Sequence, residues 1–245
     1  MPTFFVASGA VTPPVVRIDG PLLSHLRESL RVQPGETVLI TDDRGLRYRT
    51  EITAVGRHGI ECRILEMSHA PPRKSPSLVL VQALLKGEKM DWVVQKATEL
   101  GADRIVPVQT KHAVARIHRD RVEHQRARWE RIALEAAQQS ERWTVPTIDV
   151  PSDLSDATTA DTSTVRLVLT ERTAEESLTQ TPLPKTAEES LTLFIGPEGG
   201  WDESELEFLK GHGCRTATLG TSILRAETAA LTALAVVQSR VGVLG

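Results

Sequence analysis

Short apolar runs alternate with amphipathic stretches through the last two thirds of the chain. Four of these runs are suited to strands buried on both faces of a sheet: residues 77–85, 105–108, 165–170 and 191–195. The amphipathic stretches have the spacing of helices over residues 90–100, 121–139, 203–209 and 227–241. Gly101 is placed to cap the first of these helices. Alternating strands and helices predict an α/β domain with a mostly parallel sheet.

The first 70 residues have a different pattern. Short β-prone runs, several alternating apolar with charged side chains, predict half-exposed strands over residues 15–18, 36–40, 48–52 and 59–65. A helical stretch covers residues 22–30, and Asp42 to Gly45 has the composition of a hairpin turn. Many short strands joined by turns favour a small β-barrel. Three prolines within residues 70–76 bar regular structure, so we place domains at residues 1–72 and 73–245.

Two glycine-bearing loops follow strand-like runs in the second domain. The run 191–195 leads into Gly196-Pro-Glu-Gly-Gly200, and Asp202 with Glu205 then has the spacing of a helix capping box. Residues 217–228 repeat the order of strand, glycine loop and helix. Such units bind small ligands at the carboxyl edge of a parallel sheet. A tight turn without a ligand is an equally good interpretation.

Composition and charge limit the classes of protein. The 245 residues are 40% hydrophobic and 25% charged, as in ordinary globular proteins, and no apolar run is long enough to cross a bilayer. We expect a cytoplasmic protein whose two distant cysteines, Cys62 and Cys214, are buried thiols. Residues 1–148 carry 22 Lys and Arg against 17 Asp and Glu, whereas residues 149–245 carry 7 against 15. A polyanionic partner should therefore meet the first part of the chain.

Basic side chains gather in two places. The first domain carries several arginines, which as a group fit a phosphate-contacting module and singly fit a solvated surface: Arg27, Arg31, Arg44, Arg47, Arg49, Arg57 and Arg63. Residues 111–131 hold seven Lys and Arg against three acids, which favours an RNA-facing segment over a plain solvated helix face. Their histidines, His112, His118 and His124, lack the spacing of metal ligands. We predict RNA contacts at His25, Arg27, Arg31, Lys86, Lys111 and Arg116.

An ordered set of motifs resembles one known family, the bacterial 16S rRNA (uracil-N3)-methyltransferases of the SPOUT superfamily. The matching residues extend over nearly the whole chain: Lys86 to Met90, Gln95 to Gly101, Trp129, Glu135 to Ser140, Arg142, Pro146, Ile195 to Gly200, Leu219-Gly220 and Ile223 to Ala229. Two positions depart from the family pattern, because Thr3 and Ser222 stand where an arginine is frequent.

The resemblance implies a PUA-like RNA-binding barrel followed by a SPOUT methyltransferase domain with a C-terminal trefoil knot. It implies S-adenosylmethionine as the cofactor, and a homodimer with its active site at the subunit interface and no metal. The reaction would methylate N3 of a specific uridine near the decoding region, in 16S rRNA or the assembled small subunit. The implied cofactor-binding residues are Thr170, Glu171, Ile195, Gly196, Glu198, Gly199, Gly200, Leu219, Gly220, Ile223 and Leu224.

Methyl transfer to uracil N3 needs two further groups. The acceptor must lose a proton before it attacks, so a cation that stabilises the uracilate oxygens and a base would both help. Arg225, and after it Arg142, are the candidate cations. Glu198 and Glu227 are the candidate bases, although either could instead cap a helix or pair with an arginine.

Three other interpretations remain open. A related SPOUT enzyme would methylate a ribose oxygen or another base, and a non-catalytic RNA-binding factor would keep the fold without the activity. A generic nucleotide-binding enzyme is disfavoured, because neither dinucleotide-binding nor P-loop glycine motifs are present. A heptad at residues 173–179 recurs at 186–192, which we interpret as an expanded loop before the strand at 191–195.

Overall fold

The computed structural model describes residues 2–117, 119–171 and 176–244, and the chain divides into two compact units. The N-terminal unit contains residues 1–72 together with 137–144, and the C-terminal unit contains residues 73–136 and 145–245. The first division follows Pro72, where the proline-rich segment predicts a boundary. Residues 137–144 differ from the prediction, which placed them in the second domain.

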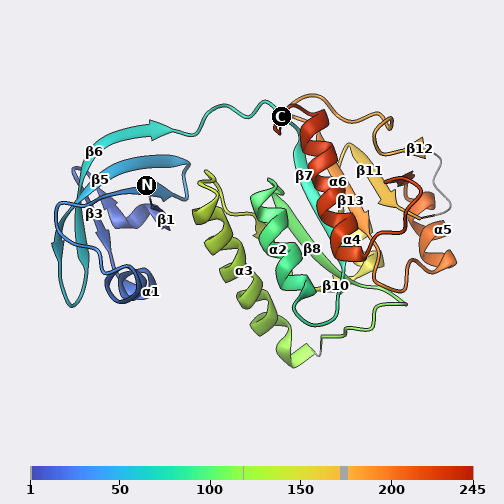
Figure 1. Cartoon of the computed structure of the whole chain (residues 1–245), viewed down its shortest axis with the longest axis horizontal. Coiled ribbons are helices and arrows are strands. Elements are labelled where there is room, and N and C mark those ends of the chain that lie inside the picture. The colour runs from blue at the N-terminus through green and yellow to red at the C-terminus, as the bar shows by residue number, and fades with distance from the viewer. Residues whose placement is uncertain (1, 118, 172–175, 245) are drawn as a thin grey trace. The chain divides into compact units, whose positions relative to one another are not determined.

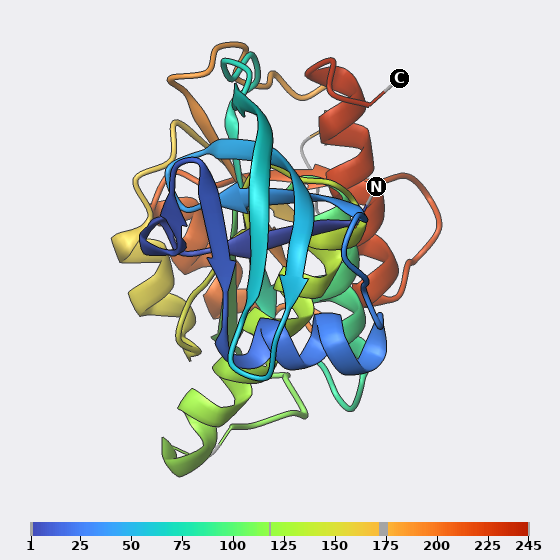
Figure 2. The ribbon, with the colours of Figure 1, turned by 90° about the vertical axis from the view of Figure 1, so that its left-hand side faces the viewer.

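The N-terminal unit is a six-stranded sheet that curls into a half-barrel (Figures 1 and 2). Its strands are β1 (Thr3–Val6), β2 (Val11–Thr12), β3 (Val15–Ile18), β4 (Thr37–Asp42), β5 (Leu46–Val55) and β6 (Ile60–His69), in the order β1-β4-β5-β6-β3-β2. Short helical turns cover Ser8–Ala10 and, as α1 and a following π-turn, Gly20–Ser24 and His25–Ser29. The four predicted strands and the helix are confirmed, whereas the edge strands β1 and β2 were not predicted. Thr3, one of the two departures from the family pattern, is buried in β1.

Asp42 explains the hairpin between β4 and β5. Its Oδ1 accepts hydrogen bonds from the backbone N–H groups of Arg44 and Leu46, both at 2.9 Å, and its Oδ2 accepts one from the Tyr48 hydroxyl at 3.0 Å. Gly45 takes the positive φ of 78° that the turn requires. The predicted turn is therefore confirmed, and a buried phenol anchors it.

Arg47 holds residues 137–144 in the N-terminal unit. Its guanidinium donates to Thr41 Oγ1 at 2.9 Å and to the carbonyls of Glu141 and Arg142 at 3.1 and 2.6 Å, and it lies 4.0 Å from the centre of the Trp143 ring. Burial lowers the pKa of Arg47, against the raising effect of Glu141. The buried guanidinium belongs to the core, which corrects its inclusion among phosphate-contacting arginines.

The C-terminal unit is built on one parallel sheet, and every strand pair in its described part is parallel. Its strands are β7 (Ser77–Ala83), β8 (Arg104–Gln109), β9 (Thr147–Ile148), β10 (Ser152–Asp153), β11 (Val165–Leu169), β12 (Glu176–Ser177), β13 (Ser190–Ile195) and β14 (Arg215–Thr218). The order is β10-β8-β7-β13-β11-β14-β12, with β9 also paired to β8. The predicted α/β class is confirmed.

Helices cover both faces of this sheet (Figure 1). They are α2 (Lys89–Glu99), α3 (Val122–Gln139), α4 (Leu154–Ala160), α5 (Glu203–Gly211) and α6 (Ala226–Arg240), with a 3-10 turn at Arg119–Arg121. Leu78 and Leu80 of β7 pack in one core with α2, α3 and α6, whereas Val79 and Val81 pack in another with α4 and α5. This alternation is what a central strand buried on both faces requires. Helix α4 was not predicted.

Gly101 and Gln238 join the end of α2 to α6. Gly101 has a φ of 87°, as expected of a helix C-cap. Gln238 Nε2 donates to the Leu100 carbonyl at 2.8 Å, and a Cβ on Gly101 would lie only 2.3 Å from that nitrogen. The predicted cap is confirmed, and it is also a contact between two helices far apart in sequence.

The repeated heptad adopts two different structures. In the second copy, Ser190 to Thr192 begin the central strand β13. In the first copy, residues 173–175 lie outside the described part, while Glu176–Ser177 form the edge strand β12 and Leu178 is fully buried. The first copy therefore contributes to the sheet, which corrects its interpretation as an expanded loop.

The composition also led to predictions about the two cysteines and about membrane-spanning segments. Cys62 and Cys214 are free and buried as predicted, and burial raises the pKa of each thiol to about 11. Across residues 2–117, 119–171 and 176–244, none of the helices has the length and apolar character needed to cross a membrane.

Candidate cofactor pocket

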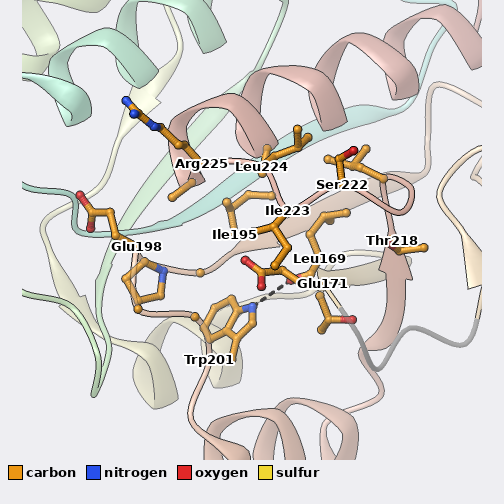
Figure 3. A pocket seen from close by; sticks show the side chains of 18 of the residues that line it. Leu169, Glu171, Ile195, Glu198, Trp201, Thr218, Ser222, Ile223, Leu224 and Arg225 are labelled. Carbon is orange, nitrogen blue, oxygen red and sulfur yellow. Dashed lines mark hydrogen bonds between the residues drawn. The ribbon is translucent and has the colours of Figure 1, made fainter.

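A cavity of about 640 Å³ opens at the carboxyl ends of three neighbouring strands of the C-terminal unit (Figure 3). Leu169 ends β11, Ile195 ends β13 and Thr218 ends β14, and all three line it. Glu198 and Arg225 stand on one side and Thr218 and Ser222 on the other. This is where open parallel sheets place their ligands. The lining residues are Lys89, Leu169, Thr170, Glu171, Ile195, Gly196, Pro197, Glu198, Gly199, Gly200, Trp201, Leu206, Thr218, Leu219, Ser222, Ile223, Leu224, Arg225, Ala226 and Ala229.

The glycine loop after β13 forms one wall of the cavity, and its backbone packs closely against Trp201 and His112. A Cβ on Gly196 would lie 3.1 Å from the ring of Trp201, and one on Gly199 would lie 3.0 Å from the Cβ of His112. Trp201 is itself held, since its Nε1 donates to the Leu169 carbonyl at 3.0 Å (dashed in Figure 3). Any side chain at Gly196 would therefore displace a tryptophan that lines the cavity.

Helix α5 begins directly after this loop with the predicted capping box. Asp202 Oδ1 accepts from Ser204 N at 3.1 Å, and Glu205 Oε2 accepts from Asp202 N at 3.1 Å. Lys111 is attached to the same cap, because its Nζ donates to Asp202 at 2.8 Å and its backbone N–H donates to Glu205. The hydrogen bond from Lys111, and to a smaller extent the one from Ser204, lowers the pKa of Asp202 to about 2. The Lys111 ammonium, a predicted RNA contact, is thus engaged within the protein.

The second wall is the segment from Leu219 to Ala226, between β14 and α6. Leu219, Ile223 and Leu224 line the cavity, and Ile223 is 57% exposed, as an apolar side chain facing an open pocket would be. Of the predicted cofactor-binding residues, Gly220 alone is not among the lining. The structure therefore brings together ten of the eleven, from segments separated by up to 54 residues in sequence.

Three charged side chains meet at one edge of the cavity. Lys89 Nζ lies 3.1 Å from Glu198 Oε1 and 3.5 Å from Glu227 Oε2, and the Lys86 backbone N–H donates to Glu198 Oε1 at 3.3 Å. Desolvation acts to raise the pKa of Glu198, but hydrogen bonds from its own backbone, from Lys89 and from Lys86 outweigh it, so that pKa is lowered. Glu198 is therefore held ionised and is a weak base.

The other predicted catalytic residues have separate settings. Arg225 lines the cavity and is the N-cap of α6; its side chain is exposed and has no ion-pair partner in the described ranges. Glu227 follows in the first turn of α6 and is absent from the lining. Its Oε2 is buried without a hydrogen bond among the described residues. Arg142 belongs to the N-terminal unit, not to the unit that contains the cavity.

The predicted RNA contacts are mostly exposed. Lys86 and Arg116 are exposed in the C-terminal unit, and His25 and Arg31 are exposed in the N-terminal unit. Arg27 is half-buried, donating to Glu28 at 2.8 Å and to the Arg57 carbonyl. Two more arginines of the predicted group form ion pairs across strands, Arg49 with Glu66 and Arg63 with Glu51. His118 lies outside the described residues.

Sequence reasoning assigned no role to Lys89 or Trp201, both of which line the cavity. Lys89 lies within the Lys86 to Met90 motif, which offered a signal, but its partners are more than 100 residues away in sequence. Trp201 directly follows the glycine loop, and an aromatic residue at that place is the signal that could have identified it.

Comparison with known proteins gives consistent results. Residues 73–238 match the family described as RNA methyltransferase domain, and residues 18–65 match the RNA methyltransferase PUA domain. Ribosomal RNA small subunit methyltransferase E of Bacillus subtilis is 31% identical over 231 residues, covering 91% of this chain and 90% of the relative. The protein of the same name from Mycobacterium tuberculosis is 31% identical, covering 96% and 90%.

A solved structure agrees along the whole length. The crystal structure of ribosomal RNA small subunit methyltransferase E from Neisseria gonorrhoeae bound to S-adenosyl methionine is 30% identical, with a TM-score of 0.85 and coverage of 98% of both chains. Since family match, sequence identity and fold all agree over nearly the full length, the chain belongs to the ribosomal RNA small subunit methyltransferase E family.

Proposed function

We propose that this protein transfers a methyl group from S-adenosylmethionine to N3 of a specific uridine in small-subunit rRNA near the decoding region, as a cytoplasmic enzyme. The observation that carries the proposal is the cavity walled by residues 195–201 and 218–226 in a chain of this family. Its glycine-rich backbone and apolar side chains suit a nucleoside and an aliphatic chain. The bound S-adenosylmethionine would supply a methyl group on a positively charged sulfur.

Arg225 is the proposed cation for the acceptor. Uracil becomes an anion when N3 loses its proton, with charge spread over the two neighbouring carbonyl oxygens, and a guanidinium can donate two parallel hydrogen bonds to such a group. Arg225 is exposed at the cavity and without an ion-pair partner in the described part of the chain. It is therefore available to a ligand without breaking an internal contact.

Glu227 is the better of the two candidate proton acceptors. Glu198 already receives hydrogen bonds from Lys86 and Lys89, and its lowered pKa makes it a poor base. Glu227 Oε2 has no hydrogen bond in the described residues, and it lies 3.5 Å from the Lys89 ammonium, farther than Glu198 Oε1 at 3.1 Å. Glu227→Gln should lower kcat while leaving S-adenosylmethionine affinity unchanged if Glu227 receives the proton; an unchanged kcat would remove it from the reaction.

The decisive test of activity is mass spectrometry of small-subunit rRNA from cells lacking the gene. Loss of 3-methyluridine near the decoding region, restored by wild-type protein but not by Arg225→Ala, is the expected result. Persistence of that nucleoside would reject the proposed target, and loss of a different methylated nucleoside would favour a related SPOUT specificity. Calorimetry should show S-adenosylmethionine binding by both proteins, because Arg225 is assigned to the acceptor; absence of binding by the wild type would favour the non-catalytic RNA-binding alternative.

We also propose a homodimer whose active site uses both subunits, with the C-terminal segment threaded as a trefoil knot. The family resemblance supports this. Sedimentation should give a dimer. Mixing inactive Arg225→Ala with inactive Arg142→Ala should restore part of the activity if one site takes these residues from different subunits, and no recovery would refute that arrangement.

A further inference from the structure

Lys89 stands where the physics of its own helix disfavours it. It is the first residue of α2, and the positive end of the helix dipole repels a cation by a few tenths of a kcal/mol to about 1 kcal/mol. Glu88 at the N-cap position makes no side-chain capping bond. Local structure therefore gives no reason for a lysine at this place, and its stabilising contacts must come from elsewhere in the fold.

Those contacts come from one wall of the cavity and from the helix turn that directly follows the other wall. Glu198 lies in the glycine loop after β13, and Glu227 lies in the first turn of α6, and Lys89 Nζ is within 3.1 and 3.5 Å of their carboxylates. The side chains of Lys89, Glu198 and Glu227 are 35%, 26% and 14% exposed. They are partly shielded from water, so their attraction exceeds that of an ordinary surface pair.

The geometry points to Lys89 as a positioning residue of the cofactor site, whose ammonium links the glycine loop to the start of α6 and fixes the distance between the two walls. This inference rests on the proposed function, since it concerns the same cavity. The glycine loop and the segment that leads into α6 are loops at the ends of strands, and such segments move unless contacts restrain them. Without the link, the cofactor would have to order both walls when it binds, and that cost would appear as lost affinity.

The link also stabilises the negative charge on the glycine loop. The pKa of Glu198 is lowered although its burial acts to raise it, and the hydrogen bond from Lys89 is among the contacts responsible. The other titratable groups around the loop are Glu227 on α6 and His112, which packs against Gly199; Lys86 contacts Glu198 only through its backbone N–H. Removing the ammonium should raise the pKa of Glu198 from its lowered value, because burial is then opposed by fewer hydrogen bonds.

Calorimetric titration with S-adenosylmethionine tests the inference. At pH 7.5, Lys89→Met should weaken binding roughly fivefold or more, as expected for loss of a partly exposed hydrogen bond between charged groups. Lys89→Arg should recover most of the affinity. Lys96→Met is the matched control. Lys96 lies on the same helix and forms an ion pair with Glu99 at 2.7 Å, and neither residue lines the cavity. This variant should bind S-adenosylmethionine like the wild type.

The pH profile separates positioning from simple structural damage. As the pH falls from about 6 to about 4, the ratio of the Lys89→Met to wild-type dissociation constants should rise, because Glu198 takes up its proton at a higher pH in the variant than in the wild type. In a Glu198→Gln background the added pH dependence should disappear.

Equal affinity of Lys89→Met and wild type, or a ratio that does not change with pH, would overturn the inference while leaving the proposed function intact. The same holds if the added pH dependence survives in the Glu198→Gln background. If the wild type itself binds no S-adenosylmethionine, the proposed function fails and the inference fails with it.

Discussion

Substituting Gly101 by alanine tests how tightly the end of α2 is joined to α6. The backbone of Gly101 has a φ of 87°, which costs an alanine about 1–2 kcal/mol. The new Cβ would stand 2.3 Å from Gln238 Nε2, so the amide must move and its 2.8 Å hydrogen bond to the Leu100 carbonyl is lost. That bond contributes about 1 kcal/mol. The free energy of unfolding should therefore fall by about 2–3 kcal/mol.

Urea unfolding at one fixed protein concentration measures this change. Gly211→Ala is the matched control, because Gly211 is the last residue of α5 and an added Cβ would meet nothing within 4 Å; it should leave stability unchanged or slightly higher. The double variant Gly101→Ala/Gln238→Ala should lose less than the sum of the single variants by about 1 kcal/mol, since the shared hydrogen bond is lost only once. Additive losses, or a loss below about 1 kcal/mol for Gly101→Ala, would refute the reasoning.

Three further predictions concern other parts of the chain. The thiols of Cys62 and Cys214 should react with a thiol reagent at pH 7.5 only on unfolding, because burial raises the pKa of each to about 11; fast labelling of native protein would contradict this. Asp202→Asn should lower stability above about pH 4 but not near pH 2. The pKa of Asp202 is lowered from 3.8 to about 2, so the stabilisation by its ionised form disappears as the pH falls through that range. A stability difference between variant and wild type that persists at pH 2 would contradict this prediction. Arg47→Met should reduce the stability of the N-terminal unit by about 2–3 kcal/mol, since two carbonyls lose a charged donor. The control Arg49→Met removes an exposed ion pair and should change the stability by less than about 0.5 kcal/mol. Equal effects of the two substitutions would refute the structural role of Arg47.

The sequence predicted local features well because their causes are local. Helix α2 and helix α6 begin and end within one residue of the predicted bounds, since apolar spacing and a following glycine or a capping position determine them. The capping box at Asp202 and the turn at Asp42 depend on contacts within four residues. Helix α4 escaped prediction because it is a short helix that includes Thr158 and Thr159, which are weak helix formers.

Features that depend on distant residues could not be predicted in the same way. Arg47 looked like any surface arginine, because its partners lie 94 and 95 residues further along the chain. The repeated heptad shows the limit most directly, since one copy contributes Glu176 and Ser177 to an edge strand and the other contributes Ser190 to Thr192 to a central strand. The cavity itself was anticipated through family resemblance and two glycine loops, but which side chains line it follows from strand order.

That strand order also affects how the protein is made. Strand β7 pairs with β8 and with β13, and roughly 110 residues separate the end of β7 from the end of β13. At synthesis rates of about 5–20 residues per second, β7 waits some 6–20 s for its second neighbour. Half of its pairing surface is exposed during that interval, which is an opportunity for misassociation. The N-terminal unit, apart from residues 137–144, is already synthesised by then, so the open edge of β7 is where we expect a chaperone on the ribosome to act.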